Sequence, residues 1–334
     1  MAIYWSECPK DRRHMTARDY GGDLGQVVWM QCQTCGELYK LRIPGAYPGR
    51  EVREGTRRKR DAIFDAFAEN SPEMTVRQVY YQLAVLGAVP KTAAGYRQAQ
   101  YQLTDLRRRE ILPYGWIADN TRWQIKPETY DGLESAMRIW HDAYRRDLWA
   151  RQAVHVEIWV EKDALAGVIS PITGRYGVAL YVARGFSSIT FAYDAAESIK
   201  HIGKPTYIYH FGDFDPSGVN AASVLREELD RHGADVWFER AAITLDQVRD
   251  YDLPTLRVNR KDPRAKTWDV GFVCELDALP AKVLREMVER CIVQHIDGEE
   301  WHNTQEAERL ERQTLGQMQR YFVQEQSFVG RGNE

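Results

Sequence analysis

Apolar runs of strand length recur through the second half of the chain, at residues 155–160, 178–183, 206–211 and 235–243. Helical segments separate them, one ending near residue 199 and one spanning 217–232. Strands that alternate with helices are typical of an α/β fold with a parallel sheet. We expect this domain to cover residues 153–296 and to include a fifth strand at 269–273.

Helical periodicity prevails in residues 50–128. It predicts helices at 58–68, 76–86 and 94–109, followed by strands at 112–116 and 121–125. Three helices with a terminal β-ribbon are the pattern of a winged-helix or helix-turn-helix unit, which binds DNA. Residues 129–152 are predicted to form an amphipathic connecting helix, and residues 297–334 a helical tail that packs on the body or on a second copy.

The first 48 residues contain cysteines in a metal-binding arrangement. Cys32 and Cys35 form a C-x-x-C-G turn, in which two thiolates can hold one tetrahedral Zn²⁺; Cys8 and His14 are the candidate third and fourth ligands. Residues 1–48 therefore resemble a zinc ribbon with a structural ion. A redox-active pair is the alternative, but the turn does not open a helix of a βαβ unit. Two strands are predicted around this turn, at 26–30 and 37–41.

Composition and charge narrow the setting of the protein. The 334 residues are 44% hydrophobic without an apolar run of 18 residues, and the first 30 lack the apolar core of a signal peptide. We therefore expect a cytoplasmic protein with no membrane partner. Residues 1–150 carry 23 Lys and Arg against 19 Asp and Glu, whereas the remainder is acidic. A basic front suits a DNA-binding, nucleoid-associated protein.

Three acidic residues follow the predicted strands directly. Glu161 comes after the strand at 155–160, and Asp213 and Asp215 come after the strand at 206–211. The carboxyl ends of parallel strands meet at one sheet edge, where α/β folds bind ligands. Three carboxylates gathered there repel one another unless a divalent cation neutralises them, and Mg²⁺ prefers oxygen ligands. We expect a Mg²⁺ or Mn²⁺ site for phosphate chemistry; a turn with helix-capping acids is the alternative.

The same residues resemble the Toprim domain, a Rossmann-like Mg²⁺-binding module of topoisomerases, primases and certain nucleases. That family places a Glu after one strand and Asp-x-Asp after a later strand. The A subunits of type IIB topoisomerases (topoisomerase VI) and their meiotic break-making relatives favour Asp-x-Asp-Pro-x-Gly, which residues 213–218 match at every fixed position. The order of a winged helix before a Toprim domain is also similar to that branch.

A tyrosine pair in the second helix extends the resemblance. Residues 77–81 read Arg-Gln-Val-Tyr-Tyr, similar to a type IIB A-subunit motif whose second Tyr attacks the DNA phosphate. The resemblance implies that Tyr81 is the nucleophile and that Arg77, one turn earlier, positions the phosphate. Gln78 departs from the family pattern, which has an acid there, and so does the cysteine module. Two aromatic residues that pack in a core are the alternative for Tyr80 and Tyr81.

Other charged residues near these motifs are candidates for phosphate or metal contact. Lys162 contacts phosphate or pairs with Asp163, and Arg184 ends a strand at the same sheet edge. Glu275 and Asp277 are candidate further metal ligands or acids, or else the acids that a helix N-terminus favours. Candidate DNA contacts on the helical unit are Arg58, Arg107 and Arg108. His210 is predicted to be a core histidine.

The resemblance implies a Mg²⁺-dependent topoisomerase-like enzyme that cleaves double-stranded DNA through a phosphotyrosyl link. The nucleophile and the metal residues lie on different domains. In the family, the tyrosine of one chain acts with the metal of the other chain of a dimer, so we expect a homodimer. The chain has no Gly-x-x-x-x-Gly-Lys-(Ser/Thr) loop, so ATP-driven strand passage requires a separate ATPase subunit. A hydrolytic Toprim endonuclease that uses metal-activated water is the alternative function, and a non-catalytic DNA-binding protein is the third.

Overall fold

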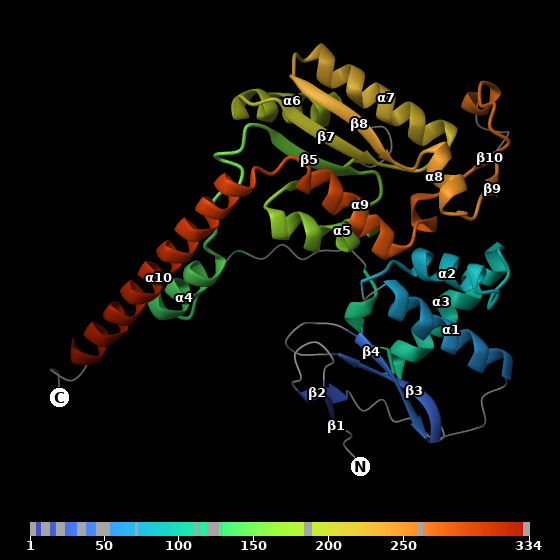
Figure 1. Cartoon of the computed structure of the whole chain (residues 1–334), viewed down its shortest axis with the longest axis horizontal. Helices are drawn as coiled ribbons and strands as arrows, with labels where there is room; N and C mark the ends of the chain where they lie inside the picture. Colours follow the sequence, from blue (N-terminus) through green and yellow to red (C-terminus); the bar gives the residue numbers. More distant parts are fainter. Residues whose placement is uncertain are drawn as a thin grey trace.

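The computed structural model describes a mixed α/β protein (Figure 1). Backbone and side chains are described for residues 54–70, 73–109, 111–112, 114–118, 127, 129–183, 189–258 and 263–321. The backbone alone is described for residues 5–7, 14–17, 24–31, 38–44 and 322–329.

A parallel sheet of four strands forms the centre of the second half, as the alternating pattern predicts. Its spatial order is β6-β5-β7-β8, and every neighbouring pair is parallel. The strands are β5 (His155–Val160), β6 (Ala179–Val182), β7 (Thr206–Phe211) and β8 (Val236–Ala242). The helices of this region are α5 (Asp163–Tyr176), α6 (Ile189–Ile202), α7 (Pro216–Arg231), α8 (Leu245–Asp250) and α9 (Ala281–Val293).

Helices cover both faces of this sheet, which explains why its strands are nearly continuous apolar runs. In Figure 1, α6 and α7 lie on one face, and α5 and α9 on the other. Successive side chains of a strand point to opposite faces. Trp159 and Ile208 accordingly pack in the core beneath α6 and α7, whereas Ile158 and Tyr209 belong to the other core.

Three helices between residues 54 and 108 pack around Phe67, Leu83 and Leu103, all fully buried. They are α1 (Glu54–Asn70), α2 (Val76–Val85) and α3 (Ala93–Arg108), which confirms the three predicted helices. Tertiary contacts link this helical unit to the sheet. The Arg285 guanidinium on α9 donates to the carbonyls of Asn70 (2.7 Å) and Glu73 (3.0 Å).

The predicted strand at 112–116 is wrong, because Tyr114–Trp116 forms a short 3-10 helix (η1). The Trp116 ring is buried 5.2 Å from the Phe67 ring. The backbone carbonyl of Trp116 accepts hydrogen bonds from the N–H groups of Glu73 and Met74, both at 3.1 Å. Trp116 therefore closes the turn that leads into α2 instead of pairing in a hairpin. The predicted strand at 121–125 lies outside the described residues.

Two further expectations need correction. The connecting helix predicted at 129–152 is only α4 (Leu133–Ala143). It ends there because the next residue is bound to the C-terminal helix: Tyr144 donates its hydroxyl proton to Glu311 (2.5 Å), and its carbonyl accepts from Arg312 (2.9 Å). The fifth strand predicted at 269–273 is β10 (Phe272–Val273), which pairs antiparallel with β9 (Leu256–Arg257) outside the parallel sheet.

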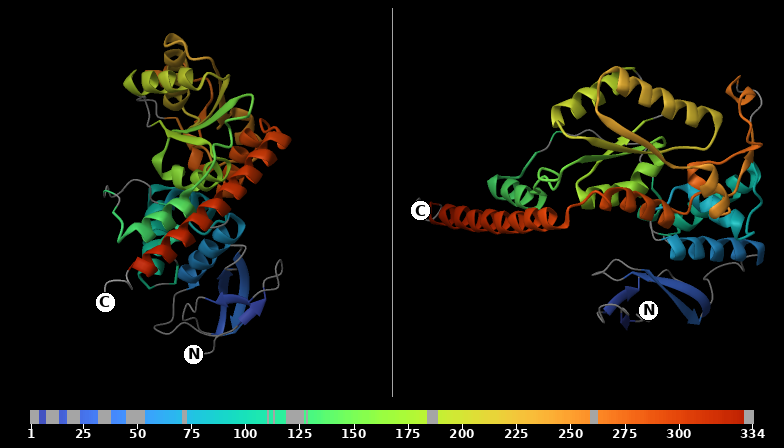
Figure 2. Two further views of the ribbon diagram at one scale, coloured as in Figure 1. Left: turned by 90° about the vertical axis from the view of Figure 1, so that its left-hand side faces the viewer. Right: turned by 45° about the horizontal axis from the view of Figure 1, so that its top comes forward.

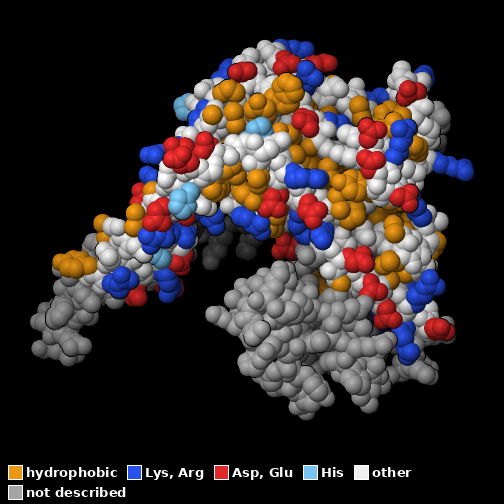
Figure 3. Space-filling view, in the orientation of Figure 1, with side chains coloured by type: hydrophobic (Ala, Val, Ile, Leu, Met, Phe, Trp, Pro, Cys, Tyr) orange, Lys and Arg blue, Asp and Glu red, His pale blue; other side chains and the backbone are white. Residues whose placement is uncertain are grey.

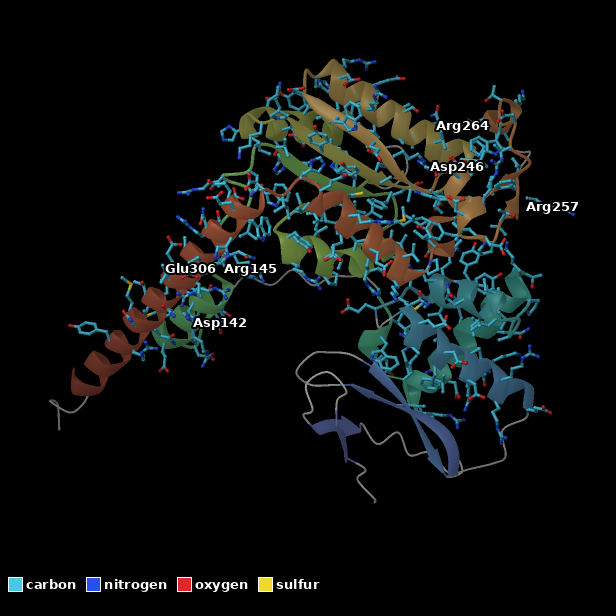
Figure 4. The ribbon with its side chains drawn as sticks, viewed as in Figure 1. Asp142, Arg145, Asp246, Arg257, Arg264 and Glu306 are labelled. Carbon is cyan, nitrogen blue, oxygen red and sulfur yellow. The ribbon has the colours of Figure 1, made fainter. Side chains whose placement is uncertain are left out.

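The C-terminal helix α10 (Gly298–Val329) packs against α4. Figures 1 and 2 show the two helices extending away from the sheet as an arm that ends near the C-terminus. Figure 4 shows Asp142, Arg145 and Glu306 on this arm, far from Asp246, Arg257 and Arg264 at the other end of the molecule. No helix in the described part of the chain is both long and apolar enough for a membrane crossing.

The N-terminal residues form a separate antiparallel sheet with the order β1-β2-β3-β4. Its last two strands confirm the strands predicted at 26–30 and 37–41. The four strands are β1 (Trp5–Glu7), β2 (His14–Ala17), β3 (Leu24–Gln31) and β4 (Leu38–Pro44). Two short 3-10 helices complete the described elements, η2 (Pro263–Lys266) and η3 (Leu276–Ala278).

Candidate active site

Glu161 and Asp213 lie together at the carboxyl edge of the parallel sheet. In the register of β5 and β7, Val160 is opposite Phe211, so both strands end at the same level. The Glu161 N–H donates to the Phe211 carbonyl (2.9 Å), and the Asp213 N–H donates to Glu161 Oε2 (3.0 Å). Burial raises the pKa of Glu161, and the charges of Asp213 and Asp215 raise it further.

Asp215 is the N-cap residue of α7. Its Oδ1 accepts the Gly218 N–H at 2.7 Å, and Pro216 occupies the first helical position, where a missing N–H costs nothing. The capping alternative therefore applies to one oxygen of Asp215. It does not account for Glu161, which caps no helix and faces Asp213.

Two glycines are required by the close packing around Glu161. A Cβ atom on Gly218 would lie 2.6 Å from the Asp213 carbonyl oxygen and 3.1 Å from Glu161 Oε2. A Cβ on Gly212 would lie 2.8 Å from Glu161 Oε2 and 2.7 Å from His210 Cε1. These contacts give the physical reason for the last glycine of the Asp-x-Asp-Pro-x-Gly motif. They also mean that the Glu161 carboxylate is held tightly in position.

Arg240 holds the loop that carries the two aspartates, a role that sequence reasoning missed. Its guanidinium donates to the carbonyls of Gly212 (3.0 Å), Gly218 (3.3 Å) and Asp213. Burial lowers the pKa of Arg240, and the charges of Glu161, Asp213 and Asp215 act in the opposite direction. The signal available in the sequence was an arginine inside a predicted strand, and that signal does not identify its partners.

His210, on the strand that precedes Asp213, is a core residue as predicted. Its ring is buried and lies 5.7 Å from the Phe238 ring. Burial, and then the charge of Arg240, lowers the pKa of His210 to about 3. The imidazole is therefore neutral at ordinary pH.

Lys162 joins the strand-end acids to a second pair of acids. Its Nζ lies 2.9 Å from Asp213 Oδ1, 3.0 Å from Asp277 Oδ2 and 3.4 Å from Glu275 Oε2. Burial acts to lower the pKa of Lys162, but the carboxylates of Asp277, Asp213 and Glu275 raise it well above its ordinary value. Lys162 is therefore a permanent cation within the cluster.

The second acid pair binds helix α2. Thr75, the N-cap residue of α2, donates its hydroxyl proton to Asp277 Oδ1 at 2.8 Å, and Arg77 forms an ion pair with Glu275. Burial acts to raise the pKa of Glu275, but Lys162 and Arg77 bring it below its ordinary value. Glu275 makes no side-chain cap hydrogen bond, so these acids serve tertiary contacts rather than a helix N-terminus.

Gln78 stands where the type IIB motif that residues 77–81 resemble has an acid, and its hydrogen bonds give a local reason for the difference. Gln78 Oε1 accepts the Thr75 N–H at 2.9 Å, while Thr75 Oγ1 accepts the Gln78 N–H at 3.0 Å. This reciprocal capping box begins helix α2 with a neutral side chain. The start of the helix is thus stabilised without adding a further negative charge beside Asp277.

Tyr81 lies on the buried side of α2, close to the same cluster. Its side chain is 2% exposed and its ring centroid is 5.1 Å from that of Tyr80. Burial raises the pKa of Tyr81 well above its ordinary value, and Glu275 adds to the effect, whereas Arg77 and Lys162 oppose it. Within the described residues, the Tyr81 hydroxyl has no hydrogen-bond partner, but the Tyr80 hydroxyl donates to the Thr92 carbonyl (3.3 Å).

Arg58 lies on α1, and Arg107 and Arg108 lie on α3. Arg58 and Arg108 are exposed, and the Arg107 guanidinium lies 5.7 Å from the Tyr114 ring centroid. Figure 3 shows Lys and Arg side chains mixed with Asp and Glu over the face in view.

Several predicted ligands fall on parts of the chain whose side chains are not described. Arg184, Cys8, Cys32 and Cys35 lie outside the described residues, and only the backbone of His14, in β2, is described. Among the residues described, no group of three or more His, Cys, Asp and Glu side chains is already converged as a metal-ligand shell. The described acids instead share Lys162 and backbone N–H groups as partners.

No protein-family model matches the chain, and no curated protein matches it.

Proposed function

We propose that the chain is a Mg²⁺- or Mn²⁺-dependent DNA-cleaving enzyme of the type IIB topoisomerase A-subunit kind. In this proposal, α1–α3 belong to a winged-helix DNA-binding domain, and the parallel sheet belongs to a Toprim domain. The observation that carries it is the ion pair between Arg77 and Glu275. This pair holds the helix of Tyr81 against acids that share Lys162 with the strand-end residue Asp213.

The strand-end acids suit a divalent cation. One oxygen of each carboxylate already accepts a hydrogen bond from a backbone N–H group, which limits rotation of the carboxylate. Glu161 Oε2 accepts from Asp213, Asp213 Oδ1 accepts from Leu276 (2.7 Å), and Asp215 Oδ1 accepts from Gly218. Burial raises the pKa of Asp213, and burial with the neighbouring acids raises that of Glu161. A cation would relieve this repulsion. When bound, the metal would polarise the scissile phosphate as a Lewis acid.

The residues of the helical unit would supply the nucleophile. Tyr81 Oη would attack the phosphorus, forming a phosphotyrosyl bond as the bond to the 3′ oxygen breaks. The tyrosine proton would pass to solvent water, and the departing 3′ oxygen would take a proton from solvent water. The pKa of Glu275 lies below its ordinary value, so it is a carboxylate at neutral pH. Arg77 and Lys162 are cations that favour the phenolate of Tyr81 against the effect of burial.

The burial of Tyr81 favours a second candidate function, hydrolysis by metal-activated water. A side chain that is 2% exposed, with a raised pKa, must be uncovered before it can reach DNA. Hydrolysis needs only the strand-end acids and a bound water, with Tyr81 as a packing residue. The same metal site serves both functions, so the fate of the cleaved ends distinguishes them.

The partners and setting of the enzyme are part of the proposal. They comprise double-stranded DNA, a second copy of the chain, a separate ATPase subunit for strand passage, a structural Zn²⁺ held by Cys8, His14, Cys32 and Cys35, and a location in the cytoplasm with the nucleoid. The homodimer comes from the resemblance alone, in which the tyrosine of one chain meets the metal of the other. Within one chain, Tyr81 already lies in the electrostatic field of Lys162 and Glu275.

The test is cleavage of supercoiled plasmid with Mg²⁺ or Mn²⁺, stopped with detergent and analysed with and without proteinase. We expect cut DNA that enters the gel only after proteinase treatment and is absent with Tyr81→Phe and Glu161→Ala. Tyr80→Phe is the matched control, because it removes one hydroxyl from the adjacent ring and should retain cleavage. Free-ended cuts that persist in Tyr81→Phe but not in Glu161→Ala would establish the hydrolase. No metal-dependent cleavage by the wild type would refute both.

A further inference from the structure

We infer that Lys162 takes the place of a second divalent cation, so that the acid site binds one metal ion per chain. The inference rests on the proposed metal site at Glu161, Asp213 and Asp215. It adds a function for a lysine that the sequence suggested only as a phosphate contact or a partner of Asp163.

The position of the ammonium carries the inference. Lys162 Nζ lies between carboxylates from separate parts of the chain: Asp213 after β7 (2.9 Å), and Asp277 (3.0 Å) and Glu275 (3.4 Å) in the segment that contains η3. Asp277 is 2% exposed, so its charge has little access to water. A buried carboxylate requires a cation close by, and the lysine supplies it.

The charges of the cluster leave room for one divalent cation. The acids are Glu161, Asp213, Asp215, Glu275 and Asp277, five negative charges when ionised. The cations are Lys162, Arg77 and Arg240, three positive charges. The remaining two negative charges are balanced by one ion such as Mg²⁺ or Mn²⁺. A second ion would leave two positive charges in excess while Lys162 is present, but only one when Lys162 is removed.

The two ends of the cluster would then have different functions, one binding the metal and the other neutralising charge beside Tyr81. Arg240 and the backbone N–H groups hold Glu161 and Asp213, where the metal would bind. Lys162 and Arg77 neutralise Glu275 and Asp277, next to Tyr81. Asp213 belongs to both ends, because its Oδ1 accepts from Lys162 and from the Leu276 N–H. Removing the lysine would expose a second site made of Asp213, Glu275 and Asp277.

The experiment counts Mn²⁺ ions bound to the full chain, by electron paramagnetic resonance of free Mn²⁺ and by calorimetry, after one equivalent of Zn²⁺ per chain has been added for the proposed cysteine site and unbound Zn²⁺ has been removed. We expect one Mn²⁺ per wild-type chain, two per Lys162→Met chain and one per Lys162→Arg chain, which keeps the positive charge. In Lys162→Met combined with Glu275→Gln, the number should return to one. Circular dichroism and a melting curve check that each variant is folded.

Two Mn²⁺ ions in the wild type, or one in folded Lys162→Met, would overturn the role of Lys162 and leave the proposed function standing. Absence of Mn²⁺ from the wild type would remove the metal site and with it this inference. Failure of DNA cleavage despite one bound Mn²⁺ would count against the proposed function alone.

If Lys162→Met does not fold, reductive methylation of lysine side chains in the wild type tests the inference instead. Lys162 should remain unmodified with and without Mn²⁺, whereas modification that increases with Mn²⁺ would show displacement by the metal and refute the inference.

Discussion

Substituting Gly218 by Ala tests the packing that holds the acid loop in position. The new Cβ would lie 2.6 Å from the Asp213 carbonyl oxygen. An ordinary carbon–oxygen contact is about 3.3 Å, so the two atoms must separate by about 0.7 Å. The obstacle is backbone that cannot yield cheaply, because Arg240 donates to that carbonyl and Glu161 accepts the N–H of the same residue.

The magnitude follows from two opposing effects. Overpacking in a closely packed region costs about 1–3 kcal/mol, and the better helix propensity of Ala returns about 1 kcal/mol. Because the Asp213 backbone is held from both sides, we expect the upper part of this range, a loss of about 2 kcal/mol in the free energy of unfolding.

Gly174→Ala is the matched control for this prediction. Gly174 lies in helix α5, and a Cβ there would meet nothing within 4 Å. Its substitution should stabilise the protein by about 1 kcal/mol. Urea unfolding of both variants measures the difference. If Gly218→Ala is as stable as Gly174→Ala, the close-packing argument is refuted. If Gly218→Ala binds Mn²⁺ with the affinity of the wild type, the substitution leaves the position of the acid loop unaffected.

Two other predictions concern the helix contact and the core histidine. Thr75→Ala should lower the free energy of unfolding, measured with urea, by about 1–2 kcal/mol. The loss should exceed that of Thr92→Ala, because both residues cap a helix but only Thr75 also donates a hydrogen bond to Asp277. Equal losses in the two variants would contradict the tertiary role of Thr75. The pKa of His210 is lowered to about 3, so the unfolded chain binds the extra proton first, and stability should fall as pH decreases from about 6.5 towards 3. His210→Gln should reduce this loss in urea unfolding at pH 7 and pH 5; an unchanged pH dependence would refute the assignment.

The main sheet and its acid residues were predictable because their signals are local. Parallel strands buried on both faces are apolar runs, so β5 and β7 were located at the correct residues. Once strand ends are known, topology alone places Glu161 beside Asp213 at one edge. The three helices before the sheet were also predicted, since apolar spacing and a capping threonine are properties of short segments.

The wrong predictions were those in which a distant contact changed the local preference. Residues 114–116 form a 3-10 helix because Trp116 packs on Phe67 and accepts hydrogen bonds from the turn before α2. The connecting helix ends at Ala143 because Tyr144 and Arg312 bind one another across the arm. Neither partner is visible in the pattern of the segment that it alters.

The sequence by itself determined the parallel sheet, the order of its elements and the three acids at its carboxyl edge, since each depends on residues close together in the chain. Only the tertiary structure decided how those acids are neutralised. Thr75 and Asp277 are 202 residues apart, and Lys162 and Asp277 are 115 apart. Such pairs form because packing of the helical unit on the sheet excludes water, and a buried charge then requires whichever opposite charge the fold brings within reach.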